Sequence, residues 1–263
     1  DKLRFEALSR PELLAGETLL YDELAAGFYY PPWAVWILLP FSLLDMQTGM
    51  ALLAIVSLTG AGAVALHAAR DAGARPAGFW AAAAVLCPYA LQVWFVGTHD
   101  AFGVVGVYLA WLALRKDLPV GFGAALVLAA VRPQHLVYAG PVFALLAVKQ
   151  WGWRPLLKAA LVPVAAMALA GLSFGFDWPV RLVRHIVEQP PGGYIGAPRP
   201  HLITSSYDLL RLAGLPGIVG LAGSLTLSLT AAAYAWRAGA TRATLDRTLV
   251  VNAIVSPHFH SQS

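Results

Sequence analysis

The chain is poor in charged residues and in cysteine. Only 12% of its 263 residues are charged, whereas a soluble domain carries about 25%, and 59% are hydrophobic. Because too little polar surface remains to cover a soluble domain of this size, we expect the lipid bilayer to be the solvent. The single cysteine, Cys87, lies in an apolar segment, which excludes a disulfide and a thiolate metal site.

Several motifs of known chemistry are also missing. There is no Walker A loop, no glycine fingerprint of a dinucleotide-binding fold and no HExxH zinc motif. The net charge of +4 comes from lysines and arginines scattered over short loops, so nucleic-acid binding is not expected. An Asp-x-Asp pair, which often holds a metal on the diphosphate of a nucleotide-sugar, is absent as well. We therefore expect neither a metal nor another cofactor.

Apolar segments dominate the chain from residue 33 onward. Residues 33–44 are shorter than the roughly 20 residues that cross a bilayer, and are interpreted as an interfacial or re-entrant helix. Eight further segments are expected to be transmembrane: 47–68, 76–95, 101–114, 119–131, 136–148, 157–175, 215–236 and 245–256. The sequence thus predicts an all-α integral membrane protein, a multi-helix bundle forming a single transmembrane domain over 1–263.

The remaining parts of the chain are polar. Residues 1–46 are interpreted as an outer loop with juxtamembrane helices, and residues 176–214 as a second outer loop. Residues 1–27 lack the apolar core of a signal peptide. Since the chain begins at Asp1 and stops after a polar cluster, we expect it to be truncated at both ends.

Within the second loop, residues 177–188 predict an amphipathic helix. Its two faces carry, respectively, Trp178, Leu182 and Ile186, and Arg181, Arg184, His185 and Glu188.

Positive charge sets the expected orientation, because cytoplasmic loops of membrane proteins are enriched in lysine and arginine. If 47–68 runs inward, four short loops on the cytoplasmic side contain ten of the 18 basic residues. These are Arg70, Arg75, Arg115, Lys116, Lys149, Arg154, Lys158, Arg237, Arg242 and Arg247. The polar segments 1–32, 97–100, 132–135, 176–214 and 256–260 then all face the outside.

A break rich in aromatic residues and proline precedes the first apolar segment. It reads Phe28-Tyr29-Tyr30-Pro31-Pro32-Trp33. The two prolines fix two φ angles and remove two N–H donors, so the chain must break there. Tyrosine and tryptophan rings suit the boundary between membrane and water. Tyr30 is therefore a candidate either for contact with the acceptor or for a residue that lines the outer loop.

Two aspartates are candidates for a general base. Judged from its position alone, Asp1 is an ordinary solvated residue. As a general base it is suited to take a proton from a sugar hydroxyl. Asp100 ends the turn Gly97-Thr98-His99-Asp100 between two apolar segments. It is suited to bind acceptor hydroxyls, with His99 beside it, or to act as the base, and equally to cap the following helix.

Basic residues at two breaks are candidates for binding a phosphate. Arg132, followed by Pro133, interrupts an apolar stretch, and its guanidinium forms paired hydrogen bonds to a phosphate or reaches to lipid headgroups. His258 and His260 follow the last apolar segment and are suited to bind a phosphate, relay a proton or hold a metal. No third ligand lies at a suitable spacing, which disfavours the metal.

Arg199 and His201 lie in the outer loop between Tyr194 and Tyr207. They would line the entrance for the acceptor or the donor, or they are ordinary solvated loop residues.

Taken in order, these features resemble the polyprenol-phosphate-sugar-dependent glycosyltransferases of the GT-C class, and within it glycosyltransferase family 87, the bacterial α-mannosyltransferase-like group. The matching runs are Leu14-Ala15-Gly16, Leu20-Tyr21-Asp22, Phe28-Tyr29-Tyr30-Pro31-Pro32, Leu39-Pro40-Phe41-Ser42-Leu43-Leu44, the turn at Gly97, Arg132-Pro133 and Ser256-Pro257-His258-Phe259-His260. The usual Lys-Pro of the family is Arg132-Pro133 here, which keeps the charge. Where the family usually has Gly-Gln-x-Asn, this chain has Gly97-Thr98-His99-Asp100. This difference is expected to alter the choice of acceptor.

The resemblance implies a membrane hexosyltransferase of the cell envelope. It would move a hexose, with mannose as the expected sugar, from a polyprenyl phosphate to a glycolipid or polysaccharide acceptor at the outer face of the bacterial plasma membrane. Asp1 matches the catalytic aspartate of the first outer loop in such enzymes. A single base and a direct displacement imply inversion at the anomeric carbon. The alternative is a transporter, a flippase or a binding protein for lipid-linked sugars, which broken helices would also suit.

Overall fold

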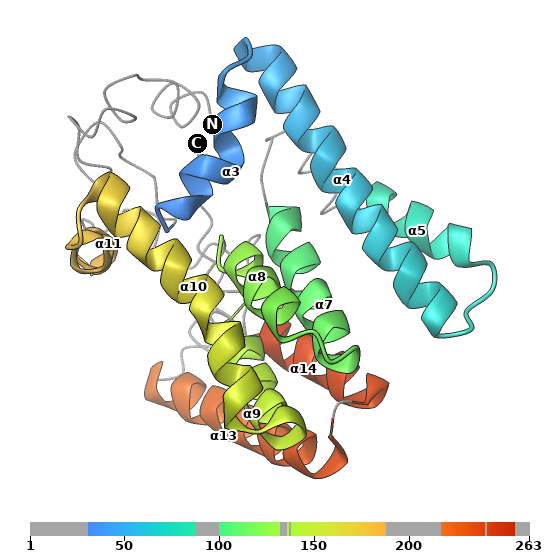
Figure 1. The fold of residues 1–263 in the computed structure, drawn as a ribbon. Helices are drawn as coiled ribbons and strands as arrows, with labels where there is room; N and C mark the ends of the chain where they lie inside the picture. Colours follow the sequence, from blue (N-terminus) through green and yellow to red (C-terminus); the bar gives the residue numbers. More distant parts are fainter. Residues whose placement is uncertain are drawn as a thin grey trace.

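The computed structural model describes residues 31–87, 100–131, 136, 138–187, 217–239 and 241–255 (Figure 1). Within these ranges the chain is helical and contains no strand. The helices are α3 (Trp33–Ser42), α4 (Met46–Asp71), α5 (Ala77–Leu86), α7 (Asp100–Arg115), α8 (Pro119–Ala129), α9 (Ala139–Trp151), α10 (Trp153–Phe174), α11 (Trp178–Val187), α13 (Gly217–Ala238) and α14 (Arg242–Val255).

Every segment expected to be apolar and helical contains one of these helices, but two boundaries were wrong. The segment expected over 76–95 ends as a helix at Leu86, because Cys87 is extended. Residues up to 156 were expected to form a loop, whereas α10 begins at Trp153 and Arg154 and Lys158 lie within it. Gly152 alone separates α9 from α10, with a φ of 72° that favours glycine. Pro155 fits in the first turn of α10 because the N–H groups there have no intrahelical partner.

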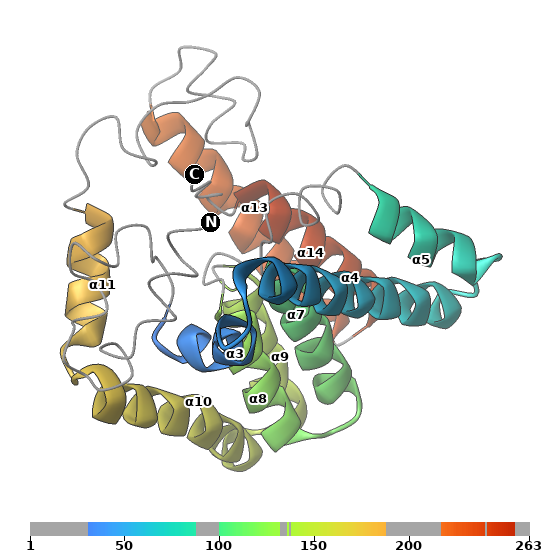
Figure 2. The same cartoon turned by 90° about the horizontal axis from the view of Figure 1, so that it is seen from above.

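Antiparallel hairpins build the molecule. α4 packs on α5, α7 packs on α8, and α13 packs on α14, while α10 lies along α8. Figures 1 and 2 both place the α7–α8 hairpin between α4 and α10. α9 packs against the core side of this hairpin, where the Trp111 and Phe143 ring centroids are 6.2 Å apart. The hairpin is therefore the centre of the described fold.

Close backbone contacts hold the central helices together. A Cβ atom added to Gly106 on α7 would lie 2.3 Å from the backbone nitrogen of Ala129 on α8. No side chain fits there, so the glycine lets the two helices approach. Contacts through small residues are typical of helices packed in membranes, where apolar burial drives association little.

Two of the described helices, α4 and α10, are long and apolar enough to cross a membrane. Only 28% of an apolar 18-residue stretch of α4 is buried, and only 17% of the corresponding stretch of α10. A core helix of a soluble protein would be mostly buried, so these helices present apolar surface outward. α10 exposes Trp153, Leu157, Leu161, Val164 and Leu172. The other expected spans correspond to shorter helices or to less apolar ones, and eight spans remain a prediction.

The short helix α3 packs inside the bundle. It follows Pro31 and Pro32 directly and has only 10 residues, about 15 Å. Trp33, Ala34, Val35 and Leu38 are buried. The helix packs against α4 and α10. It is thus too short to span a bilayer, as expected, and its buried face is covered by its neighbours.

Candidate functional site

The connections that carry the basic residues meet at one end of the molecule, called the basic end below. Arg115, the last residue of α7, donates from Nη1 to Oδ2 of Asp71, the last residue of α4, at 2.9 Å. Asp117, in the α7–α8 turn, accepts at Oδ1 from Gln150 Nε2 and Trp151 Nε1, both at 2.7 Å. These bonds join the α4–α5, α7–α8 and α9–α10 connections.

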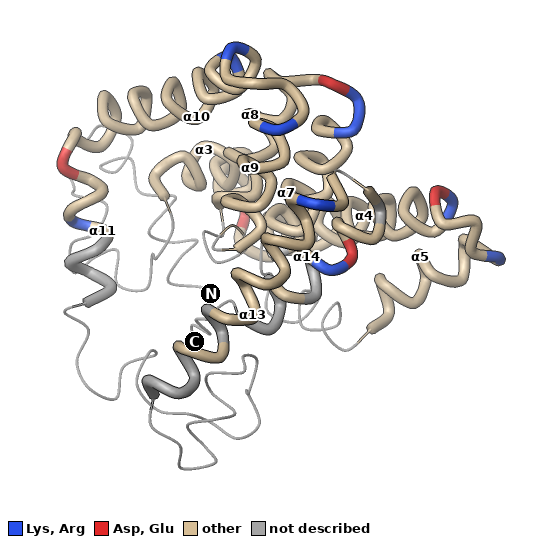
Figure 3. Tube along the Cα trace, turned by 90° about the horizontal axis from the view of Figure 1, so that it is seen from below, with Lys and Arg blue, Asp and Glu red and all other residues tan. Residues whose placement is uncertain are grey.

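The fourth basic connection belongs to the same end. Lys149 on α9 donates from Nζ to the carbonyl oxygen of Trp236, near the C-terminus of α13. Its ammonium also lies 5.5 Å from the centre of the Trp236 ring. Figure 3, which looks from below, shows lysines and arginines where the helices meet at this end. The four loops expected on one side of a membrane therefore lie together.

The opposite end contains a second buried cluster, called the Trp33 cluster below. It contains α3 along most of its length, together with the first two turns of α4, the C-terminal ends of α8 and α10 and the N-terminus of α11. Its buried members are Trp33, Ala34, Val35, Leu38, Phe41, Leu53, Val131, Ala170 and Trp178. Phe102, on the first turn of α7, packs against it. One short helix and the ends of four others thus converge around one apolar cluster beside the start of α7.

Two tryptophans connect α3 to α11 within this cluster. The Trp33 and Trp178 rings meet edge to face, with centroids 5.6 Å apart and planes at 87°. Leu182 packs on the same cluster, while Arg181 Nε donates to Asp177 Oδ2 at 2.6 Å. The helix expected over 177–188 is present, with Trp178 and Leu182 on its packed side as predicted. The side chains of residues 183–188 lie outside the described residues.

One polar atom in the Trp33 cluster lacks a partner. The indole nitrogen Nε1 of Trp33 is buried and has no hydrogen-bond acceptor among the described residues. A buried N–H without an acceptor costs free energy of about 1–3 kcal/mol. Such a group is suited to donate to a hydroxyl or phosphate oxygen of a bound molecule.

Most of the sequence-predicted site residues fall outside the described part of the chain. These are Asp1, Tyr30, His99, Arg132, Arg199, His201, His258 and His260. Asp100 is the first residue of α7. The described neighbours of three candidates do come together: Trp33 follows Tyr30 by three residues, Phe102 follows Asp100 by two, and Val131 directly precedes Arg132. All three neighbours belong to the Trp33 cluster or pack against it.

The neighbours of the two histidines are elsewhere. His258 and His260 follow α14, which packs against α9 and α13. No described residue of α14 belongs to the Trp33 cluster. The described helices therefore bring the segments next to Tyr30, Asp100 and Arg132 together without α14.

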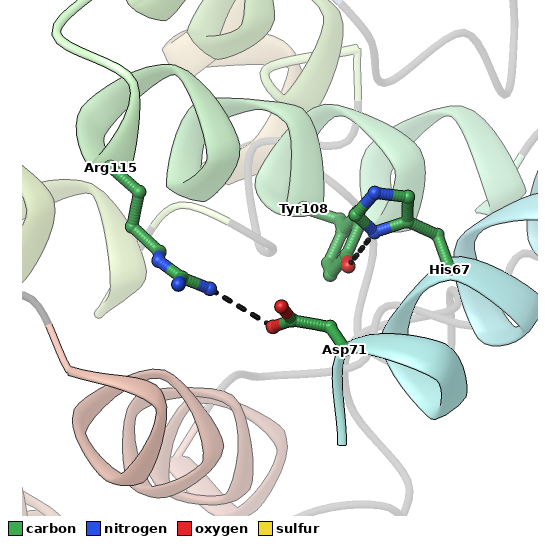
Figure 4. Close-up of polar contacts among 4 residues, drawn as sticks. All are labelled: His67, Asp71, Tyr108 and Arg115. Carbon is green, nitrogen blue, oxygen red and sulfur yellow. Dashed lines mark hydrogen bonds and ion pairs between the residues drawn. The ribbon is translucent and has the colours of Figure 1, made fainter. Parts of the chain in front are cut away.

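A polar contact between α4 and α7, at a partly exposed position, was missed by the sequence analysis. His67 Nδ1 and Tyr108 Oη lie 2.7 Å apart across the α4–α7 interface, and their rings meet edge to face (Figure 4). One turn further along α4, Asp71 makes the ion pair with Arg115. A histidine within a 26-residue apolar helix was the available signal, because polar side chains in such helices usually have partners.

No group of three or more His, Cys, Asp or Glu residues that could hold a metal gathers in the part of the chain described by the structure. A metal-free site remains a prediction.

The chain matches the model of a known protein family. The model of glycosyltransferase family 87 matches residues 28–257, which is most of the chain. The match begins at Phe28 and ends at Pro257, and so includes the Pro-Pro break, the Gly97 turn and Arg132. Searches of curated proteins and of solved structures gave no match.

Proposed function

Because the chain belongs to glycosyltransferase family 87 and is thus a glycosyltransferase, we propose that it moves a hexose, mannose, from a polyprenyl phosphate to a glycolipid or polysaccharide acceptor at the outer face of the bacterial plasma membrane. The family match supports the reaction class. The donor, the sugar, the acceptor and the site residues are our proposal.

The outward apolar surfaces of α4 and α10 support a multi-pass membrane location. A lipid-linked donor requires such a location, because its polyprenyl chain stays in the bilayer. The basic end carries Arg70, Arg115, Lys149 and Arg237, one from each of four neighbouring connections, which supports a cytoplasmic position for it. The Trp33 cluster then faces the outer leaflet.

The observation that best supports a site at this outer end is the Trp33 cluster itself. Residues adjacent in sequence to Tyr30, Asp100 and Arg132 are packed there around one buried core. Trp33 adds a buried indole N–H that has no acceptor among the described residues. The segments that carry Tyr30, Asp100 and Arg132 therefore begin or end beside the same apolar cluster. A site that binds both a lipid phosphate and a sugar acceptor requires such proximity.

In the proposed mechanism Asp1 accepts the proton of the acceptor hydroxyl as its oxygen attacks the anomeric carbon. A new C–O bond forms while the bond from the anomeric carbon to the phosphate oxygen breaks. Arg132, with His258 or His260, stabilises the charge that develops on the departing lipid phosphate. The direct displacement inverts the anomeric carbon. Asp100 binds acceptor hydroxyls and is the second candidate for the base.

A transfer assay in membranes tests this proposal. Radiolabelled polyprenyl-phosphate-mannose is offered to the complete protein, and label in lipid and glycan acceptors is counted. We expect transfer by the wild type, with a loss of at least about 100-fold in Asp1→Asn, since general base catalysis contributes about that much. Asp100→Asn is assayed in parallel. A larger loss in that variant would assign the base to Asp100.

The same assay tests the phosphate role of Arg132. Arg132→Lys keeps the charge and the residue type usual for the family, whereas Arg132→Ala removes both. We expect the alanine variant to lose donor affinity and the lysine variant to retain most of it. Equal donor affinity in wild type and Arg132→Ala would exclude the role. No transfer from any polyprenyl-phosphate sugar would overturn the proposed donor class.

A further inference from the structure

An open apolar groove of about 400 Å³ runs along the α7–α8 hairpin. Its lining residues are Leu109, Leu112, Ala113, Lys116, Leu118, Gly121, Ala124, Ala125 and Leu128. The α8 members, from Gly121 to Leu128, follow helical spacing over seven residues, which is about 10 Å along the axis. The groove is therefore an open surface groove along the hairpin, with a single charged lining residue, Lys116, at its basic end.

Residue size explains why the surface is hollow there. Gly121, Ala124 and Ala125 on α8 and Ala113 on α7 form a floor of small side chains. Leucines rise on both sides, and Leu109 and Leu118 leave 42% and 52% of their surface exposed. Figures 1 and 2 place the hairpin between α4 and α10, the two helices with outward apolar faces. In a bilayer the groove would therefore be open to lipid.

One charged side chain, that of Lys116, lines the mouth of the groove. Asp117 accepts from Gln150 and Trp151 on α9, and Arg115 is paired with Asp71 on α4. The side-chain ammonium of Lys116 has no hydrogen-bond or ion-pair partner among the described residues. The first turn of α8 beside it carries no acidic residue and no side-chain cap, so the helix dipole adds to the positive potential.

We propose that this groove binds an anionic glycerophospholipid of the cytoplasmic leaflet. One acyl chain would lie along the leucines and the phosphate would contact Lys116. The occupant follows from complementarity: the walls match a hydrocarbon chain, and the end of the groove matches a phosphate at the height where the basic end meets the headgroups. The site lies at the opposite end from the proposed transfer site, and it depends on the membrane location but not on the sugar chemistry.

The consequence is a lipid that stabilises the hairpin at the centre of the fold. By filling the groove, the chain would cover the exposed walls of α7 and α8 together. Binding to the folded state alone raises stability with lipid concentration. The expected signature is stabilisation that depends on the headgroup charge.

The experiment uses the complete protein in detergent, titrated with phosphatidylglycerol or phosphatidylcholine. Thermal unfolding and lipid retention in native mass spectrometry are measured. We expect phosphatidylglycerol to be retained and to raise Tm more than phosphatidylcholine does. Lys116→Gln should lose at least about three-fold in phosphatidylglycerol affinity, which corresponds to one weak charge contact. Lys158→Gln, an equal charge change on exposed α10 at the same end, is the matched control.

Ala124→Phe tests the apolar part. Ala124 is exposed, so a larger side chain fills the groove without entering the core. We expect this variant to lose retention of both lipids while unfolding cooperatively. Equal effects of Lys116→Gln and Lys158→Gln, or full lipid retention in Ala124→Phe, would overturn the proposal. Occupation by a second copy, seen as a dimer that Ala124→Phe dissociates without a change in lipid retention, would also overturn it. Neither readout requires transferase activity, so failure of the transfer assay remains distinguishable.

Discussion

Gly123 on α8 and Ala159 on α10 approach so closely that a Cβ atom at residue 123 would lie 2.1 Å from the Ala159 carbonyl oxygen. The neighbouring Val162 Cβ would lie at 3.2 Å. Because the first obstacle is backbone, it cannot rotate away as a side chain would. The contact therefore fixes how near α10 can lie to the central hairpin.

The first prediction concerns this contact. Gly123→Ala should force α8 and α10 apart and lower the free energy of unfolding by about 1–3 kcal/mol, as other overpacked cores do. Gly121→Ala is the matched control on the same helix, since its Cβ would meet only Leu118 Cβ at 3.6 Å and Ala113 Cβ at 3.8 Å. The control should gain up to about 1 kcal/mol from helix propensity. Thermal unfolding in detergent measures both, and equal stability of the two variants would contradict the prediction.

The second prediction concerns the N-terminus of α4. Asp45 caps this helix, and its Oδ1 accepts from the backbone N–H of Thr48 at 3.1 Å. Hydrogen bonds from the Thr48 side chain and backbone hold the pKa of Asp45 below its ordinary value of 3.8. A folded-state pKa that is lowered adds stability above the ordinary value, and this stability is lost as the pH falls through the folded pKa.

Asp45→Asn keeps a capping oxygen but cannot titrate, and Asp45→Ala removes the cap. We expect Asp45→Ala to melt at a lower temperature than either of the others near neutral pH. Below pH 3.8 the wild type should lose stability relative to Asp45→Asn. Melting curves over this range measure the difference, and a wild-type advantage that does not change with pH would refute the assigned role of the charge.

The third prediction concerns His67 and Tyr108. Replacing either partner, by His67→Leu or Tyr108→Phe, removes their hydrogen bond across α4 and α7. A double-mutant cycle should give a coupling free energy of about 0.5–1.5 kcal/mol. The nearby pair of Asp71 and Arg115 has side chains that are 35% and 39% exposed and should couple by no more than about 1 kcal/mol, with a decrease in high salt. A salt-dependent coupling at His67 and Tyr108 would contradict this distinction.

The fourth prediction concerns orientation. In a Cys87→Ser background, Ala72→Cys places a thiol at the basic end of α4, and Leu43→Cys places one just before its other end. Both positions are exposed. A membrane-impermeant maleimide applied to intact cells should label residue 43 and reach residue 72 only after permeabilisation. The reverse pattern would invert the proposed topology and move the Trp33 cluster to the cytoplasmic side.

The sequence predicted the positions of the helices well because long apolar runs and proline breaks are local signals. It failed between α9 and α10, where Lys149, Arg154 and Lys158 suggested a loop. Long basic side chains are compatible with a helix, because their stems lie along its surface while the charge reaches water. Gly152, with its positive φ, is the actual break.

The candidate site residues remain predictions, and what the sequence predicted is the set of helix ends beside three of them. Breaks next to Tyr30, Asp100 and Arg132 identified helix ends, and the expected orientation assigned them to one side. The packing of Trp33 with Trp178, and of Phe102 and Val131 beside them, depends on which helix faces meet. Such contacts join residues far apart in the chain. The roles of the site residues themselves remain predictions.

Because Gly152 alone connects α9 to α10, a change in its backbone angles rotates the whole of α10 relative to α9. The position of α10 relative to α9 depends on two dihedral angles, and a Cβ at residue 152 would meet nothing within 4 Å. Counted along the helix axis, Ala159 stands about 10 Å from this pivot and Ala170 about 27 Å. A rotation of α10 about Gly152 therefore displaces Ala170, in the Trp33 cluster, about 2.6 times as far as it displaces Ala159. The close contact of Gly123 with Ala159 therefore limits how far the C-terminal end of α10, beside the proposed transfer site, can be displaced.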